Sequence, residues 1–319
     1  MLRHLLIATI RTIQHALAPV VVASVLPAQA ATVSTLGTLE HNLDSVVMSA
    51  DGSAYISTAE RGSIMRVAHD GTREELFRAA HSYFVGVALR DQDLYITEYQ
   101  RGQVLRIRNG QSRTFATGIR GAGDIIADRS SAGFIVAATH EGKVYRLDAQ
   151  GVRSEIARGL RGVLGLAQDE AGTIYTASLR SGDVHRLGSN GPELLVRLSI
   201  PGDYKIGHLE YAHGYLFATG IGDHRIYRIS ITGNVEVFAG STRAGHVDGP
   251  AGLARFDAPN GIAAHPQRME LLISEYSGQR LRRLAFDPED LPPIGTAASN
   301  TRSRGELALS HLSQQPTQP

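Results

Sequence analysis

From residue 32 onward the chain alternates apolar and polar positions over short runs, and helical periodicity is nearly absent. Examples of these runs are SAYIST, DLYITE, GFIVAA, TIYTAS, YLFATG and ELLISE. Alternation with β-branched and aromatic residues predicts strands. Turn sequences such as ADGS (50–53), HDGT (69–72) and SNGP (189–192) supply the positive-φ positions that tight hairpins require. The pattern therefore predicts an all-β protein made of antiparallel hairpins.

The strand pattern repeats about every forty residues. Glycines 40 residues apart occur in RGSIMRV (61–67), RGQVLRI (101–107), EGKVYRL (141–147) and SGDVHRL (181–187), and two further copies follow, DHRIYRI (223–229) and SGQRLRRL (277–284). Each copy is predicted to contain four short strands. Four-stranded units repeated six times are typical of a six-bladed β-propeller. A solenoid is the alternative, but it would need atypical capping repeats at both ends, and the sequence contains none.

The two ends of the repeat array predict how the ring closes. The sixth copy ends at LRRLAF (281–286) and lacks a fourth strand, whereas the unpaired run TVSTLGTL (32–39) resembles the fourth strands SRTFATGI and RSEIARGL. We therefore expect the N-terminal strand to complete the last blade and to remove an exposed sheet edge. The prediction is an all-β, six-bladed β-propeller of four-stranded antiparallel blades that spans residues 31–287.

Both ends of the chain differ in composition from the repeats. Residues 1–30 have the features of a secretory signal peptide, with a positive start, the apolar run ALAPVVVASVL and the small-residue site AQA before Ala31. An uncleaved membrane anchor is the alternative, but prolines interrupt the long apolar helix that it needs. We expect cleavage, no membrane span and a periplasmic or secreted protein. Residues 288–319, rich in Pro, Ser, Thr and Gln, predict a disordered C-terminal tail.

The composition excludes several classes of function. A formal net charge of +1 over 319 residues argues against a nucleic-acid binder, which needs a large basic excess. The chain has no cysteine, which excludes disulfides and cysteine catalysis. It also has no G-x-S-x-G, Walker A or HExxH sequence. We expect a monomer that binds a small-molecule substrate or a protein ligand.

The segment FAGSTRAGHVDGPAGLARFDAPNGIA (238–263), together with PNGIAAHPQRMELLISEYSGQRLRRL, resembles an NHL repeat. Roughly residues 32–286 are similar to the six-bladed superfamily of NHL proteins, senescence-marker/gluconolactonase-type lactonases, strictosidine-synthase-like proteins and streptogramin (virginiamycin B) lyases. The resemblance implies the fold but not the chemistry, because one fold hosts many functions. We expect the segment to be an insertion between the last two blades, held down by Phe238, Leu253 and Phe256.

Two glutamates interrupt the repeat at the end of the second strand, where we expect side chains to converge on the channel. The equivalent residues are Thr58, Glu98, Ala138, Ser178, Gly220 and Glu275. Because four copies lack a carboxylate there, Glu98 and Glu275 are candidates for chemistry, with Glu98 as a catalytic group. The alternative is that both are rim carboxylates, solvated or paired with arginine.

The start of the first strand supplies a second ring of candidates, Asp44, His81, Asp124, His208 and Asn260. Glu, Asn and Asp oxygens around a channel suit Ca²⁺ or Mg²⁺, and we assign Glu275, Asn260 and Asp124 as metal ligands. The resemblance to lactonases implies a metal that polarises a lactone carbonyl and activates water. The resemblance to streptogramin lyases implies Mg²⁺ with a histidine base, for which His208 is the catalytic candidate. The alternative is that each histidine is structural.

Arginines in turns and loops are a third feature of the same face. Arg101 and Arg180 lie in turns between the second and third strands, and Arg161 lies in a loop that leads into a first strand. With His140 they are candidate substrate-binding residues, because arginine binds carboxylates and phosphates bidentately; ordinary solvated charges are the alternative. A different set recurs in every copy and is expected to join neighbouring blades: Arg66, Arg106, Arg146, Arg186, Arg228 and Arg283.

Two functions remain open on these observations. One is an exported, gluconolactonase-like hydrolase or lyase that uses a divalent metal on a small anionic or lactone-type substrate at the channel mouth. The alternative is a non-enzymatic NHL-repeat module that binds a ligand or protein partner on the same face. The regular repeats favour the module, whereas the deviant glutamates and the histidines favour chemistry.

Overall fold

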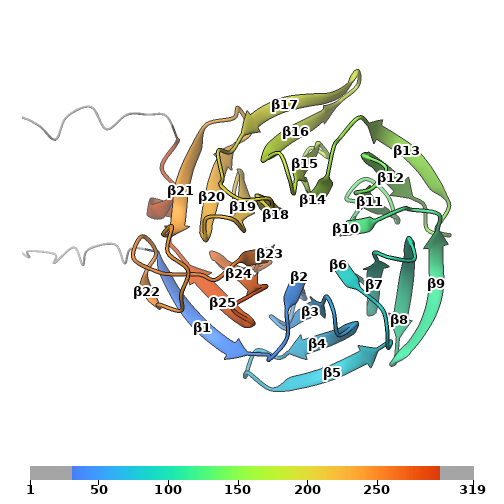
Figure 1. Ribbon diagram of the computed structural model, residues 1–319, viewed down its shortest axis with the longest axis horizontal. Coiled ribbons are helices and arrows are strands. Elements are labelled where there is room, and N and C mark those ends of the chain that lie inside the picture. Colours follow the sequence, from blue (N-terminus) through green and yellow to red (C-terminus); the bar gives the residue numbers. More distant parts are fainter. Residues whose placement is uncertain (1–30, 295–319) are drawn as a thin grey trace, which may run out of the picture.

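The computed structural model describes residues 31–294, which form a closed ring of six β-sheets around a central axis (Figure 1). Five sheets have four antiparallel strands, and the sixth has an additional two-residue strand. The only helix in this range is the 3-10 helix η1 (Pro288–Asp290), so none is long and apolar enough to cross a membrane. The all-β, six-bladed architecture is therefore confirmed. The predicted signal peptide (1–30) lies outside the described residues, so export stays a prediction.

Each of the first three blades is built from four consecutive strands, with the first strand innermost. The first blade comprises β2 (Leu43–Met48), β3 (Ala54–Thr58), β4 (Ser63–Val67) and β5 (Arg73–Arg78). The second comprises β6 (Phe84–Arg90), β7 (Asp93–Glu98), β8 (Gln103–Arg108) and β9 (Gln111–Thr117). The third comprises β10 (Ala122–Ala127), β11 (Phe134–Ala138), β12 (Lys143–Leu147) and β13 (Arg153–Arg158).

The next two blades keep this order, and the sixth departs from it. The fourth comprises β14 (Val163–Gln168), β15 (Ile174–Ser178), β16 (Asp183–Gly188) and β17 (Gly191–Arg197). The fifth comprises β18 (Ile206–Ala212), β19 (Tyr215–Gly220), β20 (Arg225–Ser230) and β21 (Val235–Gly240). The sixth comprises β23 (Pro259–Ala264), β24 (Glu270–Glu275), β25 (Arg280–Ala285), β1 (Thr32–Thr38) and β22 (Gly249–Pro250).

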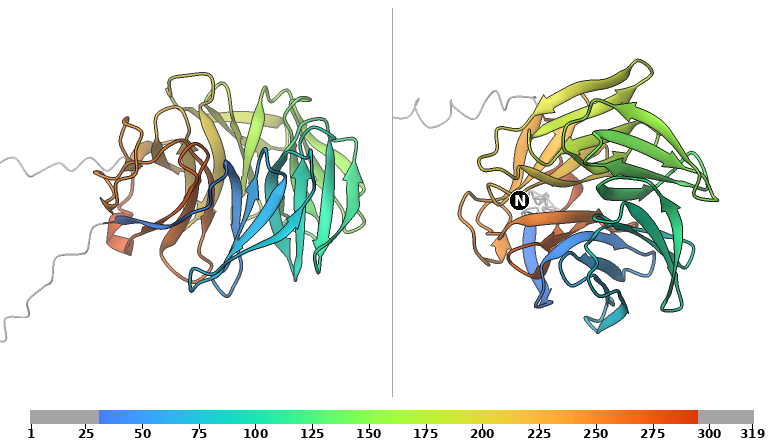
Figure 2. Two further views of the ribbon diagram at one scale, coloured as in Figure 1. Left: turned by 60° about the horizontal axis from the view of Figure 1, so that its bottom comes forward. Right: turned by 45° about the vertical axis from the view of Figure 1, so that its right-hand side comes forward.

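The first strand of the chain closes the ring, as predicted. β1 runs antiparallel to β25, with pairs from Thr32↔Ala285 to Thr38↔Arg280. Figure 1 places β1 on the outer side of β25, and Figure 2 shows this first strand in blue against the orange strands of the sixth blade. The pairing gives the backbone groups of β25 partners that would otherwise be exposed on a sheet edge.

The recurrent glycine of the repeat has a backbone reason. In the turn between the second and third strands its φ is positive, with values of 60° at Gly62, 62° at Gly102 and 75° at Gly182. A Cβ atom on Gly102 would lie 2.8 Å from the carbonyl oxygen of Ile119, in the loop to the next blade. Glycine combines this φ with this close approach at little steric cost.

The core consists of six apolar clusters, one between each pair of neighbouring blades. Between the second and third blades, for example, Tyr95 and Val104 pack with Ile125 and Phe134. Each sheet is therefore stabilised by apolar burial on both of its faces. This arrangement holds the six innermost strands around the axis, where the candidate site lies.

The ion pairs of the repeated arginines lie within their own blades, as Arg66, Arg106, Arg146, Arg186 and Arg228 show, so the expectation that these charges join neighbouring blades is wrong. Arg106 pairs with Asp93, and the same blade supplies Tyr95 as the cross-strand neighbour of Arg106. Asp93 is two residues from Tyr95 and therefore lies on the same face of the sheet, within reach of Arg106. Arg146 likewise pairs with Asp128 of its own blade at 2.8 Å.

Regular structure continues past the predicted boundary at residue 287. The helix η1 follows β25, and Leu291 packs against the apolar cluster between the fifth and sixth blades. The Arg228 guanidinium donates a hydrogen bond of 2.8 Å to the carbonyl oxygen of Pro292. Residues 288–294 therefore contact the propeller, while the rest of the predicted tail, 295–319, lies outside the described residues.

Candidate functional site

Two cavities lie on the axis of the ring. The upper cavity lies where the innermost strands begin and has a volume of about 590 Å³. The lower cavity lies where the innermost strands end and has a volume of about 220 Å³. The upper cavity is on the face where the sequence predicts a site, since its walls are the loops that lead into the first strands and the turns after the second strands.

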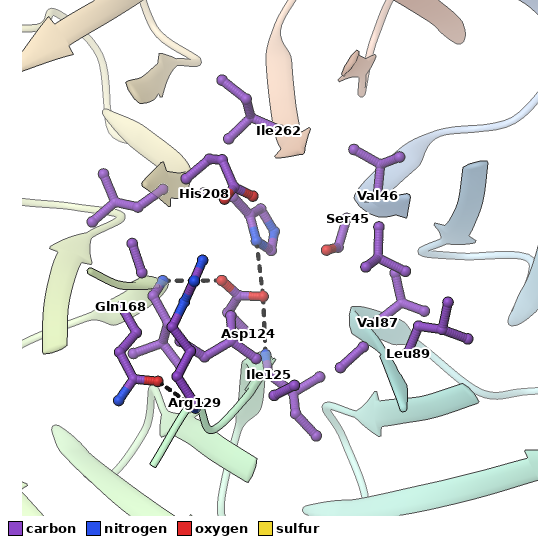
Figure 3. Close-up of a pocket in the computed structure, with 18 residues that line it drawn as sticks. Ser45, Val46, Val87, Leu89, Asp124, Ile125, Arg129, Gln168, His208 and Ile262 are labelled. Carbon is purple, nitrogen blue, oxygen red and sulfur yellow. Dashed lines mark hydrogen bonds and ion pairs between the residues drawn. The ribbon is translucent and has the colours of Figure 1, made fainter. Parts of the chain in front are cut away.

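A buried histidine between two aspartates separates the cavities. The His208 imidazole lies 3.1 Å from Asp44 through Nε2 and 3.1 Å from Asp124 through Nδ1, and all three residues are at most 5% exposed. Figure 3 shows His208 and Asp124 facing each other near the axis. Burial alone lowers the pKa of His208, but the carboxylates of Asp124 and Asp44 outweigh it and raise that pKa to about 10. The bridge therefore holds an imidazolium between two carboxylates at neutral pH.

The innermost strands determine which residues reach each cavity. Where β6, β14 and β23 begin, a larger residue precedes a glycine, and Val85, Leu164 and Asn260 line the upper cavity. In β10 and β18 the order is reversed, so that Asp124 and His208 follow a glycine and line the lower cavity.

Glycine is needed at these positions because neighbouring innermost strands approach each other closely. A Cβ atom on Gly86 would lie 2.7 Å from the carbonyl oxygen of Gly123, and one on Gly165 would lie 2.9 Å from that of Gly207. In β6 and β14 these contacts leave no room for a second side chain where the backbones meet, whereas β2 carries side chains at both positions, Asp44 and Ser45.

Four tyrosines surround the upper cavity: Tyr83, Tyr99, Tyr204 and Tyr276. The hydroxyls of Tyr83 and Tyr276 are 3.2 Å apart, and the rings of Tyr83 and Tyr99 are 6.1 Å apart between centroids. Burial raises the pKa of Tyr83, Tyr99 and Tyr276, so their hydroxyls stay protonated and can donate hydrogen bonds. The cavity therefore combines aromatic walls with neutral donors.

Four candidates named from the sequence line the upper cavity: Asp44, His140, Arg180 and Asn260. His140 contacts the edge of the Tyr99 ring at 4.8 Å between centroids, and the Arg180 guanidinium lies 5.1 Å from the centroid of Tyr204. Asn260 contributes to the floor with Asp44, and its Oδ1 is buried without a hydrogen-bond partner in the described structure. His208 and Asp124 lie directly below this floor.

The two glutamates do not converge on the axis, which corrects the expectation for Glu98 and Glu275. Glu98 is fully buried and accepts hydrogen bonds from the backbone N–H groups of Tyr83 (3.2 Å) and Arg101 (2.6 Å). Glu275 is equally buried and pairs with Arg282 at 2.7 Å. Neither side chain lines one of the two cavities. For Glu275 the alternative of an arginine-paired carboxylate is the one observed.

The cavity tyrosines were missed, although a signal for them existed. Tyr99 and Tyr276 directly follow the two glutamates in the words ITEY and ISEY. Successive residues at the end of a strand point to opposite sides, so the glutamate is directed into its own blade and the tyrosine toward the axis. The repeat irregularity identified the correct position in the fold but the wrong one of two adjacent residues.

Only one of the three arginines predicted to bind substrate lines a cavity in the described structure. Arg101 and Arg161 are exposed and line neither cavity, and Arg101 instead donates to the Ser82 hydroxyl at 2.9 Å. Arg180 alone of the three reaches the upper cavity. The mouth therefore has one arginine and not a positive ring.

The metal ligands assigned from the sequence do not form one set. Glu275 pairs with Arg282, and Asp124 accepts hydrogen bonds from the N–H groups of Ile125 (2.9 Å) and Leu166 (3.0 Å) besides facing His208. Across residues 31–294, no three His, Asp or Glu side chains are arranged to hold a metal. The trio Glu275, Asn260 and Asp124 therefore does not fit a Ca²⁺ or Mg²⁺ ion, which needs six or more converging oxygens.

Comparison with known proteins identifies the fold. No family model and no curated protein matches the sequence. Among solved structures, a gluconolactonase from Xanthomonas campestris is 15% identical over 82% of this chain and 91% of its own, with a TM-score of 0.64. Virginiamycin B lyase from Staphylococcus aureus is 16% identical over 78% and 82%, with a TM-score of 0.56.

An auxiliary nutrient binding protein from Bacteroides ovatus is 14% identical over 81% of this chain and 77% of its own, with a TM-score of 0.66. Identities at this level establish a common architecture and leave the chemistry open. The chain is thus a six-bladed β-propeller, with the fold that lactonases, streptogramin lyases and nutrient-binding proteins share.

Proposed function

We propose that the protein binds a small ring compound of the sugar type, such as a sugar acid or sugar lactone, in the upper cavity. The observation that carries this proposal is the convergence of four tyrosines, His140 and Arg180 on one concave site at the axis. Ligand sites are usually concave and apolar, with a few placed polar groups. A cavity of about 590 Å³ has the size expected of a small-molecule site.

Each part of the cavity suits a part of such a ligand. The tyrosine rings offer apolar faces to the C–H groups of a sugar ring, and the hydroxyls of Tyr83 and Tyr276 can bond its oxygens. Arg180 at the rim can hold a carboxylate bidentately. Asp44 on the floor can accept hydrogen bonds from ligand hydroxyls.

The state of His208 is the reason why we propose binding and not catalysis. Both ring nitrogens of His208 are already engaged by carboxylates, so no free imidazole nitrogen faces the cavity to take a proton from a substrate. Glu98, the other catalytic candidate, accepts hydrogen bonds from two backbone N–H groups and does not line the cavity. One fold neighbour is named as a nutrient-binding protein, so a binding function has a precedent in this architecture.

Metal-dependent hydrolysis of a lactone is the second candidate. The unpartnered Oδ1 of Asn260 and the carboxylate of Asp44 share the cavity floor, and both are oxygen donors of the kind that Ca²⁺ prefers. A divalent metal held there would polarise a lactone carbonyl. The remaining ligands would have to come from water and substrate, which makes this candidate the weaker one.

The binding proposal is tested by tyrosine fluorescence. The chain has 11 tyrosines and no tryptophan, so four cavity tyrosines form a large part of the signal. We expect D-gluconate to change the fluorescence of the protein and to raise its melting temperature. Arg180→Gln and Tyr204→Ala should each weaken binding about tenfold, the loss expected for one charge-assisted or aromatic contact.

The matched controls are Arg113→Gln and Leu253→Ala, since both residues are exposed and line neither cavity. Unchanged fluorescence and melting temperature with gluconate, glucose and gluconolactone would contradict the proposal. Hydrolysis of gluconolactone that requires added Ca²⁺ or Mg²⁺ and is lost in Asn260→Ala would favour the second candidate.

A further inference from the structure

The lower cavity is lined by one arginine, whose guanidinium makes no hydrogen bond in the described structure. Arg129, in the loop between β10 and β11, lines this cavity, and Figure 3 shows its side chain extending from the loop toward the axis. Across residues 31–294 its guanidinium makes no hydrogen bond or ion pair. The side chain is exposed and its charge acts on Glu210 of the same cavity, but its nitrogens hold no hydrogen bond that a ligand would have to displace.

The loop that carries Arg129 is firmly held. The backbone N–H of Arg129 donates to Oε1 of the buried Gln168 at 2.8 Å. The neighbouring Asp128 accepts hydrogen bonds from the Ser130 N–H (3.0 Å), the Ser131 hydroxyl (2.8 Å) and the Arg146 guanidinium (2.8 Å). Such a network fixes the backbone before any ligand arrives, which reduces the entropic cost of binding.

The lower cavity has apolar and polar walls in nearly equal parts, and its apolar surface is aliphatic. Side chains of the innermost strands supply this surface: Val46, Val47, Val87, Leu89, Ile126 and Ile262. The bridge of His208 and Asp124 closes the inner end, and the volume of about 220 Å³ is below the usual range for drug-sized ligands. The cavity therefore suits a short apolar chain with one charged end.

We propose that the lower cavity binds a short aliphatic monocarboxylate, with the carboxylate on Arg129 and the hydrocarbon chain between the valine and isoleucine side chains. A guanidinium matches a carboxylate in a planar, two-bond arrangement. A dianion such as phosphate is disfavoured, because the carboxylates of Asp124 and Glu210 line the same cavity. This site is separate from the one in the upper cavity, since the His208 bridge lies between them.

Glu210 is compatible with an anion nearby. Burial raises the pKa of Glu210 to about 7, although the charge of Arg129 acts in the opposite direction. This carboxyl group is therefore partly protonated near neutral pH and can donate a hydrogen bond. The proposal does not depend on this protonation, because Arg129 is charged at every pH of interest.

Saturation-transfer NMR on the whole protein with butyrate as the probe tests this proposal. We expect butyrate to bind, with affinity rising from acetate to butyrate as more chain is buried, and 1-butanol to bind at least tenfold more weakly. Arg129→Gln should weaken butyrate binding at least tenfold. The substitution leaves the fold in place, because the loop is anchored through the backbone N–H and not through the guanidinium.

Two control variants locate the binding. Arg113→Gln removes an exposed arginine of β9 that lines neither cavity, and Arg180→Gln removes the arginine of the upper cavity. Arg113→Gln should bind butyrate as the unaltered protein does, and Arg180→Gln should keep the butyrate binding that depends on Arg129. Absence of butyrate binding, equal binding by Arg129→Gln, or a loss that follows Arg180→Gln would each overturn the proposal.

Discussion

His208 shows how one side chain closes the axis. It brings a positive charge between two carboxylates that would otherwise be buried close together. Removing one partner of a buried ionic group leaves an uncompensated charge, which typically costs 3–5 kcal/mol. We therefore regard the His208 bridge as a structural element that separates the two cavities.

This bridge predicts a pH dependence of stability. The pKa of His208 is raised to about 10 in the folded protein, above its ordinary value of 6.5. The folded state therefore binds this proton more tightly, and the resulting stabilisation is complete below pH 6.5 and is lost as the pH rises through about 10. Urea unfolding at pH 6 to 10 should show the free energy of unfolding falling over this range.

His208→Gln is the informative variant for this prediction. It should unfold with a free energy lower by about 3 kcal/mol at pH 7, and it should lose less stability than the unaltered protein between pH 6.5 and 10. His69→Gln removes an exposed histidine and should behave as the unaltered protein does. Parallel pH profiles for His208→Gln and the unaltered protein would show that the imidazolium does not stabilise the fold.

Arg282 of β25 makes several of the contacts that hold the insertion before the sixth blade. Its guanidinium donates to the carbonyl oxygens of Arg255 (2.9 Å) and Val247 (3.1 Å), and it pairs with Asp248 and Glu275 at 2.7 Å each. The expectation for Phe256 agrees with its complete burial, whereas Leu253 is 72% exposed and does not hold the insertion. The sequence did not point to Arg282, because the adjacent Arg283 is the arginine that recurs in each copy of the repeat.

Arg282→Met should therefore destabilise this element. The change leaves Glu275 buried without its cation and frees two backbone carbonyl groups, so we expect a loss of about 3 kcal/mol in the free energy of unfolding. Limited proteolysis should cut residues 241–256 faster than in the unaltered protein. Arg243→Met in the same segment, at an exposed position, is the control. Equal stability and equal cleavage in the two variants would contradict this role of Arg282.

The propeller as a whole depends on the pairing of its two chain ends. β1 contributes the outer strand of the sixth blade, and Thr35 also bonds Asp248 of the insertion through its N–H and its hydroxyl at 3.0 Å each. Val33 belongs to the apolar cluster between the fifth and sixth blades. Ring closure thus joins hydrogen bonds and apolar burial from segments more than 200 residues apart.

Deletion of residues 32–38 should open the ring. We expect a fall in melting temperature and a less cooperative transition, both measured by calorimetry. We also expect aggregation through the exposed edge of β25, measured by light scattering. A permuted chain that supplies the same seven residues after β25 through a short turn should restore the unaltered behaviour. A deleted chain that melts as the unaltered protein does would show that β1 is dispensable.

The fold was predictable because most of its strands pair with neighbours in the sequence, and because the two ends of the repeat array complement each other. Three sequence signals specify hydrogen bonds or burial. They are the alternating apolar runs, the glycine in the turn between the second and third strands, and the complementary ends of the repeat array. The site was predictable only in part. Asn260, His140 and Arg180 line the upper cavity as residues of the expected face, but Glu98 was chosen over Tyr99, one position away.

The repeat alone was sufficient to specify six blades, their order and the closure by the first strand. The tertiary structure decided which side chains meet. Asp44 and His208 are 164 residues apart and come within 3.1 Å because the ring places their innermost strands around one axis. No local pattern encodes a distance across that axis, since it depends on the number of blades and on which strand carries a glycine at the closest approach.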